Sequence, residues 1–245
     1  MGLNIRVLQN SVAIVGWHDG VAGQIHAWLE KTHDYHIACF VNPSDEPLHI
    51  DPSQISRDAS QFSYPTKDSF KNKPLMSSSN WVQVLKDLKI KNVLITTDVP
   101  YERWKQINLA RKGGLKLINA IHPTVLIMDD VILHDNIILF PNTFIGYRAE
   151  LFPGVMVVSA HVEHHNVIKE CAFIAPGAVF GGNVTIGACT QVHTGAVIKN
   201  RIRIGENSIL GAGTVIIEDV PDNVTIVGVP GKIIKNHLPL KMSLR

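Results

Sequence analysis

The sequence contains little cysteine and little charge. Three cysteines occur among 245 residues, at positions 39, 171 and 189, and 18% of the residues are charged. An odd number of cysteines at irregular spacing fits neither a disulfide framework nor a zinc knuckle, so we expect a reducing compartment. The formal net charge of +2 excludes the strongly basic surface that binds a nucleic-acid backbone, so nucleic acid is not an expected partner.

The sequence also lacks the hydrophobic segments that address a protein to a membrane. Its first residues contain no charged leader followed by an apolar region and a cleavage site, and no apolar run approaches the ~20 residues that span a bilayer. We therefore expect a soluble, cytoplasmic protein with no membrane partner. A chain of 245 residues is long enough for two domains, each with its own core.

The N-terminal half predicts a small parallel α/β domain that ends at residue 118. Short apolar runs, typical of buried strands, alternate with amphipathic stretches that are typical of helices. The strand-like runs begin at Val12, His36, Asn92 and Leu115, and the helical stretches begin at Val21, Trp81 and Tyr101. Between residues 42 and 80 the composition turns to Ser, Asp, Pro and Asn without periodicity, which predicts loops.

The C-terminal half has an internal period of six residues. Counting in sixes from Ile132 to Ile216 gives fifteen positions, and every one except Glu150 is apolar. The overall composition would give about seven apolar positions by chance, so the period is genuine. Small residues recur at a second position of the hexad, at Ala172, Ala178, Thr190, Ala196, Ser208 and Thr214. The pattern predicts a solenoid in which one apolar side chain of each hexad points inward and a tight corner follows.

These hexads resemble those of the hexapeptide-repeat transferases. The resemblance implies a left-handed parallel β-helix over residues 119–245, with three hexads in each triangular coil and about five coils in all. Exposed faces with apolar side chains need covering, and the family covers them by forming trimers, so a homotrimer is also implied. The predicted fold is thus an N-terminal α/β, Rossmann-like domain of residues 1–118, followed by a left-handed parallel β-helix of hexapeptide repeats.

A closer resemblance involves the bacterial sugar O- and N-acyltransferases that modify nucleotide-linked amino sugars or sialic acids. It covers nearly the whole chain, and its motifs are NAIHPTV at residues 119–125 and VEHHNVIKECAFIAPGAVFGGNVTIG at residues 162–187. By this resemblance His164 is the catalytic base, and Gly182 is the glycine whose backbone N–H stabilises the developing oxyanion. Histidine suits the first role because its pKa lies near neutral pH.

The resemblance implies acetyl-CoA as the acyl donor and no metal. The residues implied for acetyl-CoA are small or lie in the Gly-x-Pro segment near the C-terminus, which borders the acyl-CoA tunnel in the family. They are Gly181, Gly182, Ala212, Gly213, Val229, Pro230 and Lys232.

The resemblance further implies a nucleotide-sugar substrate. In the N-terminal domain, glycines in the turn after the first strand permit close approach of a diphosphate, and the following helix favours an anion. The residues implied there are Gly16, Gly20 and Gly23, with Asn42 at the end of the second strand. In the β-helix, His161 and His165 are expected to line the acceptor pocket. His165 stands where the family carries a carboxylate that orients the base, and Phe173 replaces a second family histidine.

Three other functions compete with N-acylation of a nucleotide-linked amino sugar. O-acetylation of a sialic-acid-like sugar remains open, although the glycine turn favours a nucleotide-linked acceptor. A non-catalytic trimeric binding protein is also open, because the orienting carboxylate is replaced. A zinc enzyme that uses His161, His164 and His165 is disfavoured, because their spacing does not match and adjacent residues of a strand point to opposite faces.

Overall fold

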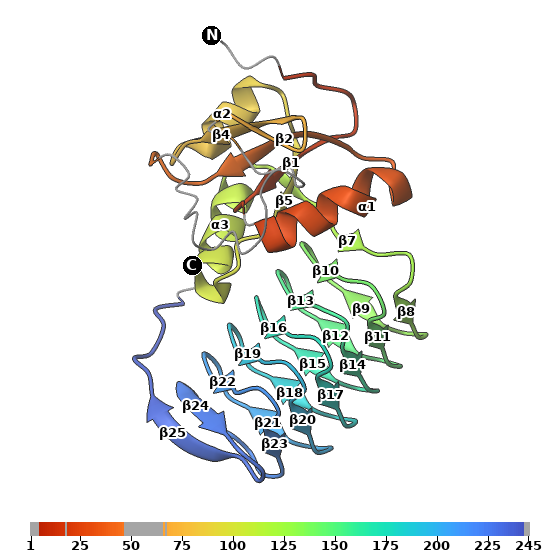
Figure 1. The fold of residues 1–245 in the computed structure, drawn as a ribbon, viewed down its shortest axis with the longest axis vertical. Helices are drawn as coiled ribbons and strands as arrows, with labels where there is room; N and C mark the ends of the chain where they lie inside the picture. The colour runs from red at the N-terminus through yellow and green to blue at the C-terminus, as the bar shows by residue number, and fades with distance from the viewer. Residues whose placement is uncertain (1–4, 18, 47–65, 67, 243–245) are drawn as a thin grey trace, which may run out of the picture. The chain divides into compact units, whose positions relative to one another are not determined.

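The computed structural model describes residues 5–17, 19–46, 66 and 68–242. The chain divides into two compact units: Met1–Asp98 with Lys105–Ile118, and Val99–Trp104 with Asn119–Arg245. Figure 1 shows helices and a sheet in the first unit and a stack of triangular coils in the second. Within the described residues, no helix is long and apolar enough to cross a membrane.

The first unit contains a mostly parallel sheet with the strand order β3-β4-β2-β1-β5-β6. Its strands are β1 (Ser11–Val15), β2 (His36–Asn42), β3 (Ser69–Phe70), β4 (Lys73–Ser77), β5 (Asn92–Ile95) and β6 (Lys116–Leu117). All five residues of β1 are buried, as expected for an interior strand of a parallel sheet. The predicted strands and helices are therefore confirmed for this unit.

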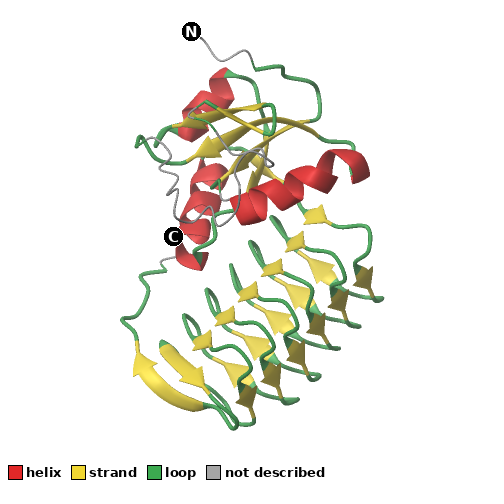
Figure 2. Cartoon of the chain, viewed as in Figure 1, coloured by secondary structure: helices red, strands yellow, loops and turns green. Residues whose placement is uncertain are grey.

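The helices follow the predicted order (Figure 2). A single π-helical turn, η1 (Asp19–Gly23), leads into α1 (Gln24–Thr32), and α2 (Trp81–Asp87) and α3 (Pro100–Lys112) follow. Buried Ile25, Trp28 and Leu29 form the apolar stripe of α1, at the spacing of three and four residues that defines one helix face.

The prediction of loops throughout residues 42–80 is wrong for β3 and β4. Leu75 and Met76 of β4 are buried, and β4 pairs in parallel with β2 through Phe40 and Leu75. The run is too short to show a period and contains Pro74, so its strand conformation depends on pairing with β2 rather than on local propensity. The rest of that interval, residues 47–65 and 67, lies outside the described residues.

The second unit is a parallel β-helix with three flat faces, which Figure 2 shows as three rows of short strands. The first face contains β7 (Ala120–Ile121), β10 (Ile138–Leu139), β13 (Met156–Val157), β16 (Phe173–Ile174), β19 (Gln191–Val192), β22 (Ile209–Leu210), β24 (Val224–Val227) and β25 (Lys232–Asn236). The second face contains β8 (Leu126–Ile127), β11 (Phe144–Ile145), β14 (His161–Val162), β17 (Val179–Phe180), β20 (Val197–Ile198) and β23 (Val215–Ile216). The third face contains β9 (Ile132–Leu133), β12 (Glu150–Leu151), β15 (Val167–Ile168), β18 (Thr185–Ile186) and β21 (Arg203–Ile204).

Strand pairing gives the size of each coil. Ala120 pairs with Ile138, and Ile138 with Met156, so one coil contains eighteen residues or three hexads, as the resemblance implied. The strands from β7 to β21 form five complete coils, and β22 and β23 begin a sixth. The helix begins at Ala120, two hexads before the first position that the period identified.

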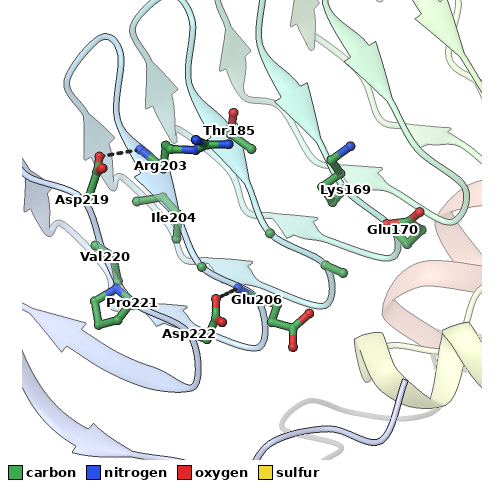
Figure 3. A pocket seen from close by; sticks show the side chains of 13 residues that line it. Lys169, Glu170, Thr185, Arg203, Ile204, Glu206, Asp219, Val220, Pro221 and Asp222 are labelled. Carbon is green, nitrogen blue, oxygen red and sulfur yellow. Dashed lines mark hydrogen bonds between the residues drawn. The ribbon is translucent and has the colours of Figure 1, made fainter. Parts of the chain in front are cut away.

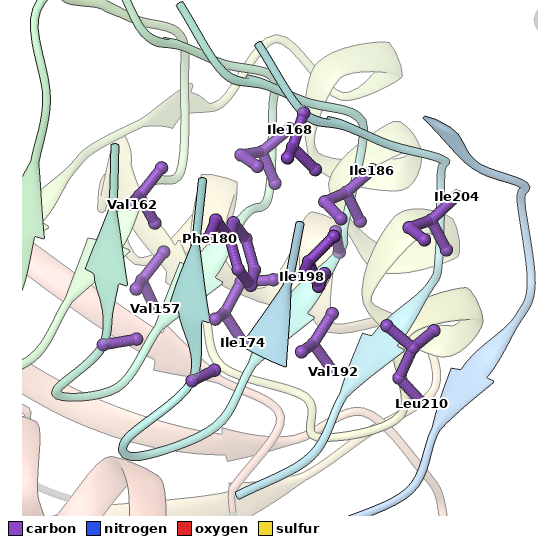
Figure 4. Close-up of a cluster of buried hydrophobic side chains, with 14 of the residues drawn as sticks. Val157, Val162, Ile168, Ile174, Phe180, Ile186, Val192, Ile198, Ile204 and Leu210 are labelled. Atoms are coloured by element: carbon purple, nitrogen blue, oxygen red, sulfur yellow. The ribbon is translucent and has the colours of Figure 1, made fainter. Parts of the chain in front are cut away.

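The predicted inward residues are correct only in the later coils. From Val162 to Ile216 the interior side chains are those that the count of six identified (Figure 4). Before Val162 each interior residue lies one position later, as at Leu139, Leu151 and Val157. The two registers meet at Val157–Val162, where the spacing shortens to five and Phe144 pairs with His161, seventeen residues on.

Glu150 therefore lies on the outside of the β-helix. Its side chain is 33% exposed, and its Oε1 lies 2.9 Å from Nε2 of His134. The sequence concealed this register because the outward positions before Val162 include Ile132, Ile138 and Phe144, which are themselves apolar. The count of six therefore met apolar residues whether the counted position pointed inward or outward.

The corners are made by residues that leave little room for side chains. A Cβ added to Gly187 would overlap the backbone of Glu206 in the next coil, so glycine is required there. The small residues that recur in the hexads are buried. Those with hydroxyl groups form hydrogen bonds to the backbone: Thr190 donates to the carbonyl of Gly205 at 2.6 Å, and Ser208 donates to that of Pro221 at 2.9 Å.

The register can be tested with Leu151→Ala and Glu150→Ala, two changes at neighbouring positions. We expect Leu151→Ala to lower the free energy of unfolding by ~2–5 kcal/mol, because it opens a cavity among interior side chains. Glu150→Ala should change it by less than ~1 kcal/mol, because it removes only a partly exposed contact with His134 on the outside of the β-helix. Urea unfolding at one fixed protein concentration measures both, and an equal loss in the two variants would contradict the register.

Candidate active site

His164 lies at the corner where the second face meets the third, in the turn between β14 and β15. The same corner carries Gly182 in the next coil. The amide of Asn183 donates to the carbonyl of His164 at 3.0 Å, and the amide of Arg201 donates to the carbonyl of Gly182 at 2.9 Å, so the turns stack directly. The eighteen-residue coil thus brings the two predicted catalytic residues together.

The ring of His164 lies against Gly182. A Cβ built on Gly182 would be 2.5 Å from Nε2 and 2.9 Å from Nδ1 of His164, so only glycine leaves room for the imidazole. Among the described residues the Gly182 amide N–H has no hydrogen-bond acceptor. A free N–H beside an exposed imidazole is an arrangement that can donate to an oxyanion while the imidazole takes a proton.

The two adjacent histidines point toward each other. Nδ1 of His164 lies 3.0 Å from Nδ1 of His165, and the two rings meet edge to face with an interplanar angle of 87°. The prediction that neighbouring side chains point to opposite faces is wrong here, because the residues lie in a turn rather than a strand. His165 has φ 58°, in the left-handed region, and its amide donates to the carbonyl of Tyr147 at 2.8 Å.

Glu163 does not contact the ring of His164. Its Oε1 lies 2.9 Å from Nε2 of His161, and its Oε2 accepts the backbone N–H of His164 at 3.3 Å. The hydrogen bond from His161, aided by the His164 amide, lowers the pKa of the Glu163 carboxyl below its ordinary value. His161 lies on β14, with its ring stacked on Phe144 at a centroid distance of 4.4 Å.

The residues implied for acetyl-CoA lie at three places. Gly181 adjoins Gly182 at the corner of His164, whereas Ala212 and Gly213 lie at the corner between the first and second faces. Those two are separated from His164 by the width of the second face within one chain. The remaining three, Val229, Pro230 and Lys232, are exposed at the turn between β24 and β25 and in β25 itself.

A pocket of 360 Å³ lies beside this C-terminal turn, three coils along the β-helix from His164. Pro230 and Lys232 line it together with Ile217 and Glu218, which occupy the corner of His164 in the last coil. Phe173, by contrast, lies on β16 of the first face, so a single chain does not bring it to His164.

The residues implied for the nucleotide gather at one edge of the first unit's sheet. Gly16 follows β1 with φ 88°, and an added Cβ would overlap Thr97, so glycine is required. Its amide donates to the carbonyl of Val41 at 2.9 Å, next to Asn42 at the end of β2. Gly20 and Gly23 lie in η1, which leads into α1. The Asn42 side chain donates to Ser77 Oγ at 3.2 Å.

A larger hollow, of 690 Å³, lies elsewhere on the β-helix (Figure 3). It is lined by acidic and basic side chains, and two of its carboxylates accept backbone amides: Asp219 that of Arg203 and Asp222 that of Glu206, each at 2.8 Å. None of the residues predicted from the sequence lines it. Within the part of the chain that the structure describes, no group of three histidine, cysteine or acidic side chains is placed to hold a metal ion.

Tyr147 is a site residue that the sequence did not indicate. Its ring contacts that of His165 edge to face at 5.7 Å, and its carbonyl accepts the His165 amide. The coil length supplies the signal that could have found it, because Tyr147 precedes His164 by seventeen residues, one coil that includes the five-residue step.

The three cysteines are buried and are not placed to act as nucleophiles. Burial raises the pKa of Cys39 and of Cys189 to about 12. At pH 8 the thiolate fraction of such a group is on the order of 10⁻⁴.

We therefore expect the folded protein to react with fewer than one equivalent of 5,5′-dithiobis(2-nitrobenzoate) within minutes at pH 8, and with three equivalents in guanidinium chloride. Rapid reaction of the folded protein would contradict the buried positions. The same measurement sets the background of any thiol-release assay.

Comparisons with known proteins agree with the fold. No family model matches the chain. It is 31% identical over 111 residues to galactoside O-acetyltransferase of Escherichia coli (strain K12), covering 44% of this chain and 46% of that protein. It is 46% identical over 104 residues to serine acetyltransferase of Synechococcus elongatus, covering 39% and 41%. The chain thus spans about half the length of the curated relatives it matches.

Solved structures match over more of the chain. A variant of perosamine N-acetyltransferase from Caulobacter crescentus, in complex with CoA and GDP-perosamine, has a TM-score of 0.81 and 21% identity, covering 94% of this chain and 100% of that one. The acetyltransferase domain of PglB from Neisseria gonorrhoeae, in complex with acetyl coenzyme A, has a TM-score of 0.76 and 23% identity, covering 92% and 99%. The α/β unit followed by a left-handed β-helix is therefore confirmed, and about two fifths of the chain is similar in sequence to acetyltransferases.

Proposed function

We propose that this protein is an acyl-CoA-dependent acyltransferase that transfers an acetyl group to the amine of a nucleotide-linked amino sugar. The observation that carries the proposal is the packing of the His164 imidazole against Gly182, beside an amide N–H that has no acceptor among the described residues. The likeness in fold to proteins bound to CoA and GDP-perosamine supports the choice of donor and acceptor.

His164 is the general base of the proposed reaction. Its Nε2 takes a proton from the acceptor nitrogen as that nitrogen bonds to the thioester carbon, and the proton then passes to the sulfur when the C–S bond breaks. The Gly182 N–H donates to the carbonyl oxygen as negative charge develops there. No side chain forms a covalent intermediate in this scheme, which agrees with the burial of the cysteines.

The corner of His164 offers a continuous path for acetyl-CoA. Three coil steps of ~4.8 Å separate His164 from Glu218, so the path extends roughly 14 Å along the β-helix. Gly181 and Gly182 present no side chain along it, and it ends at the pocket lined by Pro230 and Lys232. The Lys232 ammonium suits a phosphate at that end. The proposed chemistry requires no metal.

The second face supports a homotrimer. Its outward column is apolar except at His161, and Leu126 is 57%, Val179 42% and Val197 40% exposed in the single chain. Exposed apolar rows of this kind are covered in stable assemblies. Packing this face against a neighbouring subunit would bring Ala212 and Gly213 of one chain toward His164 of another, which completes the proposed acetyl-CoA site.

We assign nucleotide-sugar binding to the N-terminal domain, residues 1–118. Gly16 and Asn42 lie at the carboxyl ends of adjacent parallel strands, where open α/β sheets bind their ligands. Gly20 and Gly23 precede α1, whose N-terminal N–H groups favour a phosphate.

The first test is release of free thiol from acetyl-CoA in the presence of a panel of UDP-, dTDP- and GDP-linked amino sugars and hydroxyl acceptors. We expect turnover with an amino sugar, lowered ~10²–10⁴-fold in His164→Ala because the general base is removed. His134→Ala, a histidine on another corner, is the matched control and should retain activity. Turnover with hydroxyl acceptors alone would indicate an O-acetyltransferase, and no turnover on any acceptor would indicate a binding protein.

The trimer can be tested with Val197→Asp on the second face. The buried carboxylate in a packed interface should dissociate the assembly, because an unpaired charge is costly to desolvate. Light scattering coupled to size-exclusion chromatography measures the mass, and Thr185→Asp on the third face is the matched control. A mass of one chain for the unchanged protein would refute the trimer.

A further inference from the structure

A hydrogen bond joins the imidazole rings of His164 and His165. In a neutral imidazole, one ring nitrogen carries a hydrogen and can donate, and the other has a lone pair and can accept. The Nδ1 atoms lie 3.0 Å apart, so one of them carries a hydrogen and the other accepts it. If His164 accepts a proton at Nε2, its own hydrogen must sit on Nδ1. His165 is then the acceptor, with its hydrogen on Nε2.

We propose that His165 positions the ring of His164, by accepting the Nδ1–H of His164 and leaving the Nε2 lone pair free for the acceptor amine. This inference rests on the proposed function for its catalytic consequence. His165 touches neither acetyl-CoA nor the acceptor in this role, so it is a positioning residue. The His165 imidazole thereby fixes the orientation of the His164 ring by a hydrogen bond, as a carboxylate at this position would do.

The structure holds His165 in place from three sides. Its backbone is in the left-handed region at φ 58°, its amide donates to the Tyr147 carbonyl, and its ring meets the Tyr147 ring edge to face. These contacts come from the coil that precedes His164. Gly182 closes the other side of the His164 ring, so the imidazole is fixed between two coils.

The charged side chains near His164 and His165 contact other groups and not the two imidazole rings. Glu163, in the same turn, is bound to the His161 ring and to the His164 backbone N–H. From the preceding coil, the Arg148 guanidinium lies over the Tyr147 ring at 4.8 Å, and its Nε lies 3.3 Å from Asp130. Gly182, from the following coil, contributes only backbone. Within the described residues, no carboxylate is hydrogen-bonded to either ring of the pair.

Two substitutions at His165 test the positioning role. His165→Ala removes the acceptor, so we expect kcat to fall roughly tenfold with little change in KM, since one hydrogen bond to the base is lost. His165→Asn restores an acceptor oxygen without a titrating group and tolerates the left-handed backbone, so most of the rate should return.

Nuclear magnetic resonance of ¹⁵N-histidine-labelled, full-length protein provides a readout that needs no activity. The expected result is the Nδ1–H tautomer of His164 in the unchanged protein and in His165→Asn, and a mixture of tautomers in His165→Ala. Urea unfolding of all three proteins controls for the fold.

The inference is overturned if His165→Ala leaves kcat and the His164 tautomer unchanged. It is also overturned if His165→Asn is as impaired as His165→Ala while both are folded. If the unchanged protein transfers no acyl group to any acceptor, the proposed function fails, and the tautomer of His164 still decides whether His165 holds the ring.

Discussion

Parallel pairing between coils eighteen residues apart is the constraint on which the β-helix depends. Each two-residue strand is too short to be stable alone, and its backbone groups are satisfied only by the coils before and after it. Interior side chains stack at the same spacing from Leu139 to Ile216, except across the five-residue step, where stacked residues are seventeen apart. The requirement for close stacking is also what makes glycine necessary at corners such as Gly187, where the next backbone leaves no room for a Cβ.

The candidate site follows from the same constraint. His164 and Gly182 are one coil apart, so they face each other because the coil closes on itself. Tyr147 supports His165 for the same reason, from the coil before. A corner is a favourable place for chemistry because its side chains project from the body of the helix, while the stacked backbone holds them in fixed positions. Gly182 differs from Gly187 in this respect, because its missing Cβ makes room for the His164 imidazole rather than for the backbone of the next coil.

The five-residue step between Val157 and Val162 lies immediately before this site. It shifts the pairing of Phe144 to His161 and brings His161 to the outer surface of β14. His161 then stacks on Phe144 and binds Glu163, which keeps the carboxylate away from the His164 ring. The Glu163 carboxylate is thus bound by His161, and His165 is the side chain that is hydrogen-bonded to the His164 ring.

The sequence alone determined the period, the α/β unit before it and the inward residues after Val162, because these depend on spacing along the chain. The resemblance to the acyltransferases, and not the spacing, indicated His164 and Gly182. It did not determine strand β4, whose conformation depends on pairing with β2, nor the register before Val162, where apolar residues occupy both faces of the strands. Only the tertiary structure decided that His164 and His165 point toward each other. The chain turns a corner at His165, a residue in the left-handed region, and a rule for side chains that alternate along a strand does not apply to a turn.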